Sequence, residues 1–127
     1  MEVIHRRCAG MDVSKTDTKV CVRVAGSVRR ATAETVSTWG ATTNQVLALR
    51  EHLIEQGVTL VVLEATGDYW KPFYYLLEDA PFELMLVNAR QVKNLPGRKT
   101  DVTDAAWLAQ LGAHVGQAFL RPTCSDP

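Results

Sequence analysis

The chain has 127 residues, of which 46% are hydrophobic and 22% are charged. This length and composition predict one globular domain that can bury a core. Fourteen basic and fourteen acidic residues cancel, which excludes a general electrostatic attraction to nucleic acid and leaves only a local patch or another domain to provide one. No stretch resembles a signal peptide or a membrane span, so we expect a cytoplasmic protein with no membrane partner.

The three cysteines, Cys8, Cys21 and Cys124, are widely spaced and form no CxxC pair. Their odd number and spacing argue against a disulfide framework and against a zinc knuckle. We expect free thiols in a reducing compartment.

The first third of the chain predicts three strands joined by short turns. Apolar residues alternate with others around Asp12 and again over residues 20–24, as in strands with one buried face. Gly26 and Ser27 suit a tight hairpin turn into a third strand over residues 28–36. Strands connected in this way form an antiparallel meander.

The rest of the chain predicts alternating helices and strands. We expect a helix capped at Thr42 and closed at Gly57, strands at 59–63 and 84–87, and helices at 72–79, 88–94 and 101–111. The complete order predicts an α/β, ribonuclease H-like fold: a five-stranded mixed sheet, made of the meander plus two parallel strands, with helices on its faces.

Four carboxylates occupy positions that a fold normally avoids. Asp12 and Glu64 each end an apolar run, and Asp101 and Asp104 lie three residues apart in the first turn of the last expected helix. Because carboxylates brought together from separate elements repel one another, such a cluster requires a cation or must take up protons. Oxygen ligands without histidine or cysteine favour Mg²⁺ or Mn²⁺, and a pair of such ions serves phosphoryl transfer.

Each of these acids also has a structural interpretation. Asp12 alone suits a turn, Glu64 alone suits an exposed strand end, and carboxylates in a helix first turn are favoured by the helix dipole. However, Asp101 and Asp104 both share a helix face with Leu108, so both lean toward the packed side. Taken together, the four acids favour a metal site.

Basic residues lie just before the last two acids: Arg90, Lys93, Arg98 and Lys99. A solvated helix and loop would explain them, since most charged runs are of that kind. Their position beside the acids makes contact with nucleic-acid phosphates an equally good interpretation.

Other residue types give weaker indications. Ser14 follows Asp12 closely, but the sequence places no histidine base beside it, so a serine nucleophile here has little support. We expect the aromatic residues to pack in the core and not to stack on bases: Tyr69, Trp70, Phe73, Tyr74, Tyr75 and Trp107.

Four motifs, taken in chain order, carry a family resemblance. They are Gly-Met-Asp-Val-Ser-Lys at 10–15, Leu-Glu-Ala-Thr-Gly at 63–67 followed by Tyr-Trp at 69–70, the segment 87–93, and Pro-Gly-Arg-Lys-Thr-Asp-Val-Thr-Asp-Ala at 96–105. Together they resemble the DEDD transposases of bacterial insertion sequences, in the insertion-sequence 110 group. The resemblance covers nearly the whole chain, and the last motif is highly specific.

The resemblance implies a domain similar to Holliday-junction resolvases that acts on DNA phosphodiesters during transposition in the bacterial cytoplasm, at the nucleoid. It implies that the metal-binding and catalytic acids are Asp12, Glu64, Asp101 and Asp104, which we expect to bind two Mg²⁺ or Mn²⁺ ions.

In that family the resolvase-like domain precedes a second domain that carries a catalytic serine, and a guide RNA encoded by the element directs recombination. We expect residues 1–116 to form the first domain and residues 117–127 a tail leading to the second, with a homo-oligomer in the full-length protein. Ser125 matches no motif and is not assigned the serine's role. We therefore expect the chain alone not to exchange DNA strands.

Two interpretations from other classes stay open. Actin-like and sugar-kinase ATPases share this fold and an Asp on the first strand, but Val13, Ser14 and Lys15 do not supply their glycine-rich phosphate turn. The domain could also be a nucleic-acid-binding and dimerisation module without turnover. ATP binding would support the former, and nucleic-acid binding without metal or cleavage would support the latter.

Overall fold

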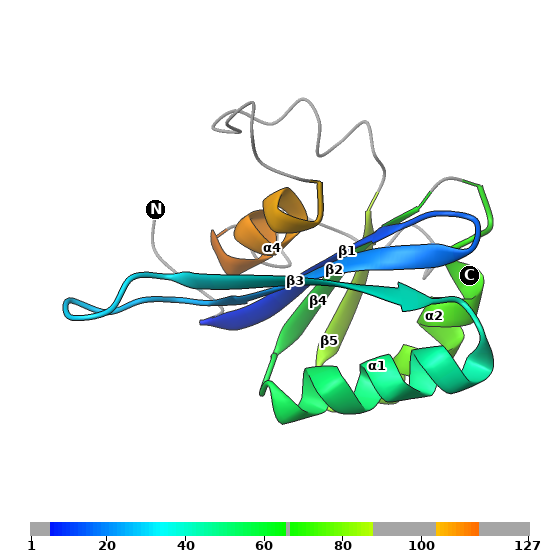
Figure 1. Cartoon of the computed structure of the whole chain (residues 1–127), viewed down its shortest axis with the longest axis horizontal. Helices are drawn as coiled ribbons and strands as arrows, with labels where there is room; N and C mark the ends of the chain where they lie inside the picture. The colour runs from blue at the N-terminus through cyan, green and yellow to red at the C-terminus, as the bar shows by residue number, and fades with distance from the viewer. Residues whose placement is uncertain (1–5, 66, 88–103, 115–127) are drawn as a thin grey trace.

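A five-stranded mixed sheet runs through the molecule, with α1 and α2 on one face and α4 on the other (Figure 1). This computed structural model describes residues 6–65, 67–87 and 104–114. Its elements are β1 (Arg7–Val13), β2 (Asp17–Val24), β3 (Ala33–Gly40), α1 (Thr43–Glu55), β4 (Leu60–Ala65), α2 (Lys71–Leu77), β5 (Glu83–Val87) and α4 (Asp104–His114).

The sheet order is β3-β2-β1-β4-β5. The first three strands pair antiparallel, whereas β1 pairs parallel with β4 and β4 pairs parallel with β5. The predicted ribonuclease H-like sheet, a meander extended by two parallel strands, is therefore confirmed. The helix expected at 88–94 lies outside the described residues.

The third strand lies farther along the chain than predicted. Residues 28–32 belong to the hairpin end between β2 and β3, and the tight turn lies between Ser27 and Arg30 and not at Gly26. Ser27 and Arg30 exchange two backbone hydrogen bonds, of 2.8 and 3.3 Å. These bonds close the hairpin two residues beyond the predicted turn. The strand predicted over 28–36 instead covers Ala33–Gly40, so both of its predicted ends were wrong.

Both predicted limits of α1, the cap at Thr42 and the stop at Gly57, are confirmed. The side chain of Thr42 accepts a hydrogen bond from the backbone N–H of Gln45, as an N-cap does, and fixes the start of the helix. Gly57 has a φ of 70°, a left-handed conformation that glycine adopts without strain, directly after the helix end.

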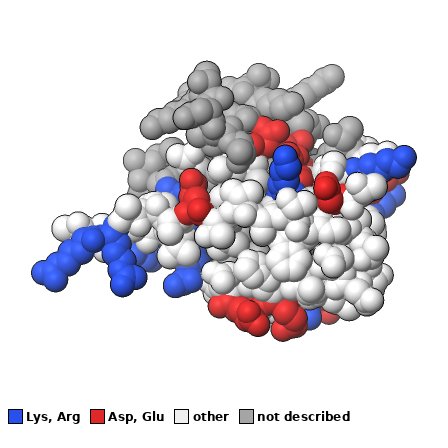
Figure 2. Space-filling model, in the orientation of Figure 1, with Lys and Arg blue, Asp and Glu red and all other residues white. Residues whose placement is uncertain are grey.

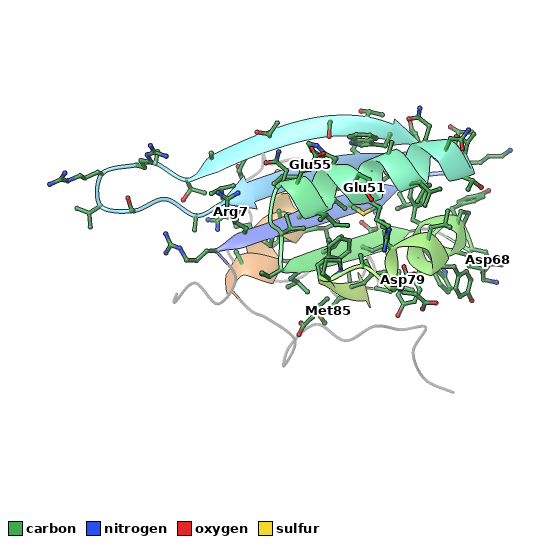
Figure 3. All side chains as sticks on the ribbon, turned by 90° about the horizontal axis from the view of Figure 1, so that it is seen from below. Arg7, Glu51, Glu55, Asp68, Asp79 and Met85 are labelled. Atoms are coloured by element: carbon green, nitrogen blue, oxygen red, sulfur yellow. The ribbon has the colours of Figure 1, made fainter. Side chains whose placement is uncertain are left out.

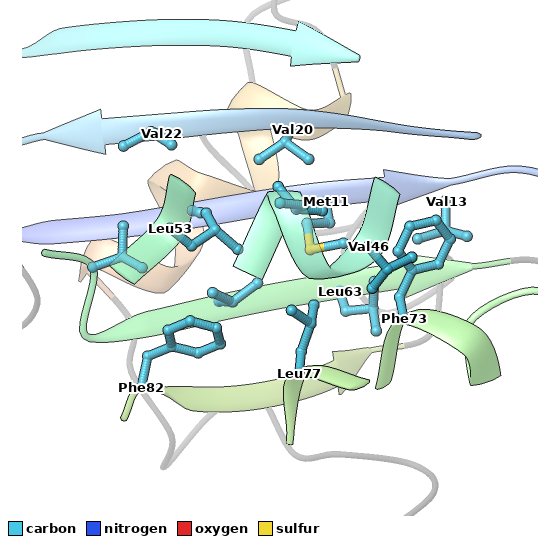
Figure 4. Packing of buried hydrophobic residues seen from close by; sticks show 14 of the residues in the cluster. Met11, Val13, Val20, Val22, Val46, Leu53, Leu63, Phe73, Leu77 and Phe82 are labelled. Carbon is cyan, nitrogen blue, oxygen red and sulfur yellow. The ribbon is translucent and has the colours of Figure 1, made fainter. Parts of the chain in front are cut away.

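The larger hydrophobic cluster lies on the sheet face covered by α1 and α2 (Figure 4). Alternate residues of β1 and β4, including Met11 and Leu63, point into it and are fully buried. Leu53 of α1 meets them there, as do Phe73 and Leu77 of α2. This cluster fixes the two central strands relative to the helices below them.

The opposite sheet face packs against α4 through small side chains. The thiol of Cys8 donates a hydrogen bond of 3.0 Å to the backbone oxygen of Ala109, and Cys21 lies in the same buried cluster. Burial raises the pKa of Cys8 to about 12 and that of Cys21 to about 11, so both thiols stay protonated at neutral pH. Both are free, as predicted, while Cys124 lies outside the described residues.

The aromatic residues divide between core and surface. Phe73 and Trp107 are buried, as expected. Tyr69 and Tyr75 are 41% and 60% exposed, so the expectation that they pack in the core was wrong. For Tyr75 the reason is helical spacing, since it lies two residues from Phe73 on α2 and therefore points to the other side, whereas Tyr69 precedes the helix.

No helix in the described ranges combines the length and the apolar character that crossing a bilayer requires.

Phe73 is buried and Tyr75 is largely exposed on the same helix, so their replacement should lower stability by different amounts. Phe73→Ala should lower the free energy of unfolding by about 3–5 kcal/mol, because it opens a cavity in the core. Tyr75→Ala, the matched control, should lower it by no more than about 1 kcal/mol, because the side chain is largely exposed and loses ring contacts with Trp70 and Tyr74 but no core packing. Urea denaturation followed by circular dichroism measures both. Equal losses would show that α2 is not packed as described.

Candidate metal centre

The first two acids of the site lie side by side on neighbouring parallel strands. Asp12 of β1 and Glu64 of β4 are register partners, and each is the penultimate residue of its strand. Partners in a parallel pair project from the same face of the sheet. Cys8 and Leu60, which face α4, share the alternation of these two acids, so Asp12 and Glu64 also lie on the α4 face.

The third acid comes from α4, which begins at Asp104. Gly10 allows this helix to lie directly on β1, because a Cβ at position 10 would lie 2.2 Å from the backbone oxygen of Ala105 and 2.4 Å from the backbone nitrogen of Ala109. Near the far end of the helix, a Cβ at Gly112 would lie 2.8 Å from a side-chain methyl of Val62, so the helix is close to β4 there as well. The close contact brings the first turn of α4 to the strand ends that carry the acids.

The three carboxylates converge on one point. One oxygen from each of Asp12, Glu64 and Asp104 lies within 4.8 Å of the others. Glu64 is 7% exposed, whereas Asp12 and Asp104 are half-buried. Glu64 therefore forms the floor of the cluster, and the other two acids line its opening to solvent. All three donors are oxygens, which is the ligand set of Mg²⁺ and Mn²⁺.

The structure thus brings together three of the four predicted acids, and their interpretation as separate structural residues does not account for the convergence. The fourth, Asp101, lies outside the described residues, as do the four basic candidates. Those basic residues are Arg90, Lys93, Arg98 and Lys99.

A basic residue that the sequence analysis missed lies beside the acids. Lys19 of β2 is the register partner of Asp12 across the antiparallel β1–β2 pair, and its side chain is exposed. Directly opposed residues project from the same face, so Lys19 adds a positive charge beside the cluster. The alternation of Val20 and Val22 does indicate that Lys19 faces away from them, but only the register places it opposite Asp12.

Ser14, the weak nucleophile candidate, has a structural role in the β1–β2 turn. Its hydroxyl donates hydrogen bonds to the backbone oxygen of Asp17, at 3.2 Å, and to the Asp17 carboxylate, at 2.5 Å. These bonds hold the exposed Ser14 side chain in the turn and give it a structural role.

Comparison with known proteins gives the family. The model of the DEDD transposases of the insertion-sequence 110 group, described as a transposase, matches residues 9–125. The chain belongs to this family. No significant match was found among curated protein sequences.

Two solved structures share the fold of this transposase domain. One is RuvC of Thermus thermophilus, with a TM-score of 0.64 and 12% identity over 91% of this chain and 99% of that one. The other is the T. thermophilus RuvC in complex with a Holliday junction substrate, with a TM-score of 0.65 and 12% identity over 93% and 99% of the two chains. The expected resolvase-like fold is therefore confirmed, and the two alternative interpretations are not favoured.

The dependence of the site on close packing of α4 yields a prediction. Gly10→Ala should displace the first turn of the helix and destabilise the domain by about 1–3 kcal/mol, because backbone atoms of α4 occupy the added Cβ position. It should also weaken Mn²⁺ binding by about tenfold or more, as changes that misplace ligands do. Calorimetric titration and urea denaturation measure the two effects.

The matched control is Gly40→Ala at the end of β3. There the added Cβ would lie 3.3 Å from the flexible side chain of Gln45 and should leave both stability and Mn²⁺ affinity nearly unchanged. Wild-type Mn²⁺ affinity in Gly10→Ala would contradict the role of this contact.

Proposed function

We propose that Asp12, Glu64 and Asp104, together with Asp101, hold divalent ions that promote cleavage of DNA phosphodiesters during transposition. The convergence of three carboxylate oxygens within 4.8 Å carries this proposal. The cluster lies on a resolvase-like sheet in a chain of a transposase family, which supports DNA as the substrate.

The residues fit a divalent ion. Three carboxylates so close together repel one another, and an ion shared among them removes that repulsion. A bound Mg²⁺ or Mn²⁺ ion would neutralise charge at the phosphate and activate an oxygen nucleophile. We propose two ions, the second held with the help of Asp101.

Each residue then has a distinct role. Glu64, buried on a central strand, gives the site a rigid ligand whose position the core determines. Asp12 and Asp104 are half-buried, so an ion that they hold would remain accessible to a substrate phosphate. Lys19, exposed beside Asp12, is placed to contact a neighbouring phosphate of the same strand.

Membership of this transposase family also supports proposals about the substrate and the partners of the domain. We propose that the substrate is branched DNA, since the T. thermophilus structure holds a Holliday junction substrate. Arg90, Lys93, Arg98 and Lys99 are proposed to contact its phosphates. A guide RNA encoded by the element and a homo-oligomer of the full-length protein complete the proposal, which places the protein at the nucleoid in the bacterial cytoplasm.

The test is cleavage of a four-way DNA junction and of a linear duplex under single-turnover conditions with Mn²⁺. Asp12→Asn and Glu64→Gln should each lower the rate by about a hundredfold or more, because each removes a carboxylate that positions the ion.

The control for this assay is Asp79→Asn. It removes an exposed carboxylate that pairs with Arg50 at 3.5 Å, away from the acid cluster, and should leave cleavage unchanged. Cleavage by Asp12→Asn at the wild-type rate would refute the proposal, as would equal losses in all three variants.

A further inference from the structure

The connection between β2 and β3 projects beyond the body of the molecule as a basic hairpin arm, defined as residues 25–32 (Figure 1). Two features give it a defined shape. Ser27 and Arg30 bridge across its end, and the backbone N–H of Gly26 donates to Oγ1 of Thr32 at 3.0 Å. A Cβ at Gly26 would lie 2.2 Å from the backbone oxygen of Arg30, so only glycine permits this close approach. The arm is therefore a built hairpin and not an irregular loop.

Arginines concentrate on this arm and at its base. Arg29 and Arg30 are exposed at the tip. Arg6 and Arg7 are exposed at the base, where the backbone N–H of Ala25 donates to the backbone oxygen of Arg6 at 2.7 Å. Basic side chains gather along this projection in Figure 2, and Figure 3 shows Arg7 near its base. A chain with no net charge thus carries a strongly positive end.

Arg29 and Arg30 form no ion pair with a carboxylate in the described part of the protein. The nearby Glu34 pairs instead with Arg23, at 3.8 Å. Val28, between the bridge residues, is fully exposed, so no described residue covers the tip. Two adjacent guanidinium groups are available to an external anion, and planar guanidinium groups suit phosphate oxygens.

The distance between the arm and the acid cluster matches a nucleic-acid duplex. Lys19 lies opposite Asp12, and Val28 is nine residue steps farther along the chain, which spans at most about 30 Å at 3.3 Å per step. A duplex presents the same side again after one helical turn of about 34–36 Å. A duplex with one phosphate at the acids therefore presents another on the same side close to the tip.

We propose that the basic hairpin arm binds the phosphate backbone of a nucleic-acid duplex about one helical turn from the strand held at the metal centre. Arg29 and Arg30 make this contact, with Arg6 and Arg7 extending it along the arm. The inference rests on the proposed action on nucleic acid. It adds a second contact surface, separate from the metal centre, and so lengthens the stretch of duplex that the domain binds. Contacts of this kind position the duplex without reading its sequence.

The experiment measures binding of the 127-residue chain to a DNA duplex and to an RNA duplex of about 24 base pairs, roughly two helical turns. Fluorescence anisotropy gives the affinity between about 50 and 200 mM salt, with Ca²⁺ in place of Mn²⁺ to limit cleavage. The proteins are wild type, Arg29→Ala/Arg30→Ala, and the charge-conserving control Arg29→Lys/Arg30→Lys. Melting curves verify that all three are folded, as expected for changes at exposed positions.

Loss of two phosphate contacts should reduce the slope of log affinity against log salt by about 2 in the alanine variant, since each contact contributes about 0.9. The advantage of wild type over that variant should shrink about tenfold between the two salt concentrations. The lysine variant should keep the wild-type slope, because it keeps both charges. A reduced slope on both duplexes, or on only one, supports the proposal and identifies the backbone that the arm holds.

An unchanged slope in the alanine variant, with wild type bound to the duplex, would overturn the arm proposal and leave the metal centre untouched. Cleavage that depends on Asp12 but not on Arg29 or Arg30 would then still support the proposed function. Absence of binding to either duplex by any of the three proteins would contradict both proposals.

Discussion

The in-register parallel pairing of β1 with β4 is the constraint on which the site depends. It places Asp12 beside Glu64 on one face of the sheet, while the alternate residues Met11 and Leu63 anchor both strands in the core below. A shift of one residue in this register would move an acid to the α1 and α2 face. The hydrophobic core therefore fixes the position of the acids.

Repulsion among the three carboxylates of the acid cluster lowers the stability of the folded domain. Glu64 is almost fully buried beside two other carboxylates, an arrangement that favours folding only when a cation or protons balance the charge. The contact of α4 at Gly10 holds Asp104 in the cluster in spite of this repulsion. Residues whose mutual repulsion is overcome by packing from three separate elements are typical of sites that bind a metal or a substrate.

Much of this arrangement could be predicted from the sequence because local signals agreed with one another. Runs of apolar residues defined β4 and β5, Thr42 and Gly57 bounded α1, and the motifs around the acids named the family before their geometry was known. Contacts that depend on register or on hairpin closure could not be predicted. Lys19 is a site residue only through its pairing with Asp12. Residues 28–32 of the basic hairpin arm, predicted to begin a strand, instead form the hairpin end that the Ser27–Arg30 bridge closes.

The most direct test of the metal centre compares the thermal stability of wild type and Asp12→Asn with and without Mn²⁺. At about ten times its dissociation constant, the ion should stabilise the wild type by about 1.4 kcal/mol, which raises Tm by roughly 3–6 °C. Asp12→Asn should lose this increment and, without Mn²⁺, should be at least as stable as the wild type, because one repelling charge is gone. An equal rise of Tm in both proteins, or a markedly less stable variant without the ion, would contradict a site in which Asp12, Glu64 and Asp104 share a cation.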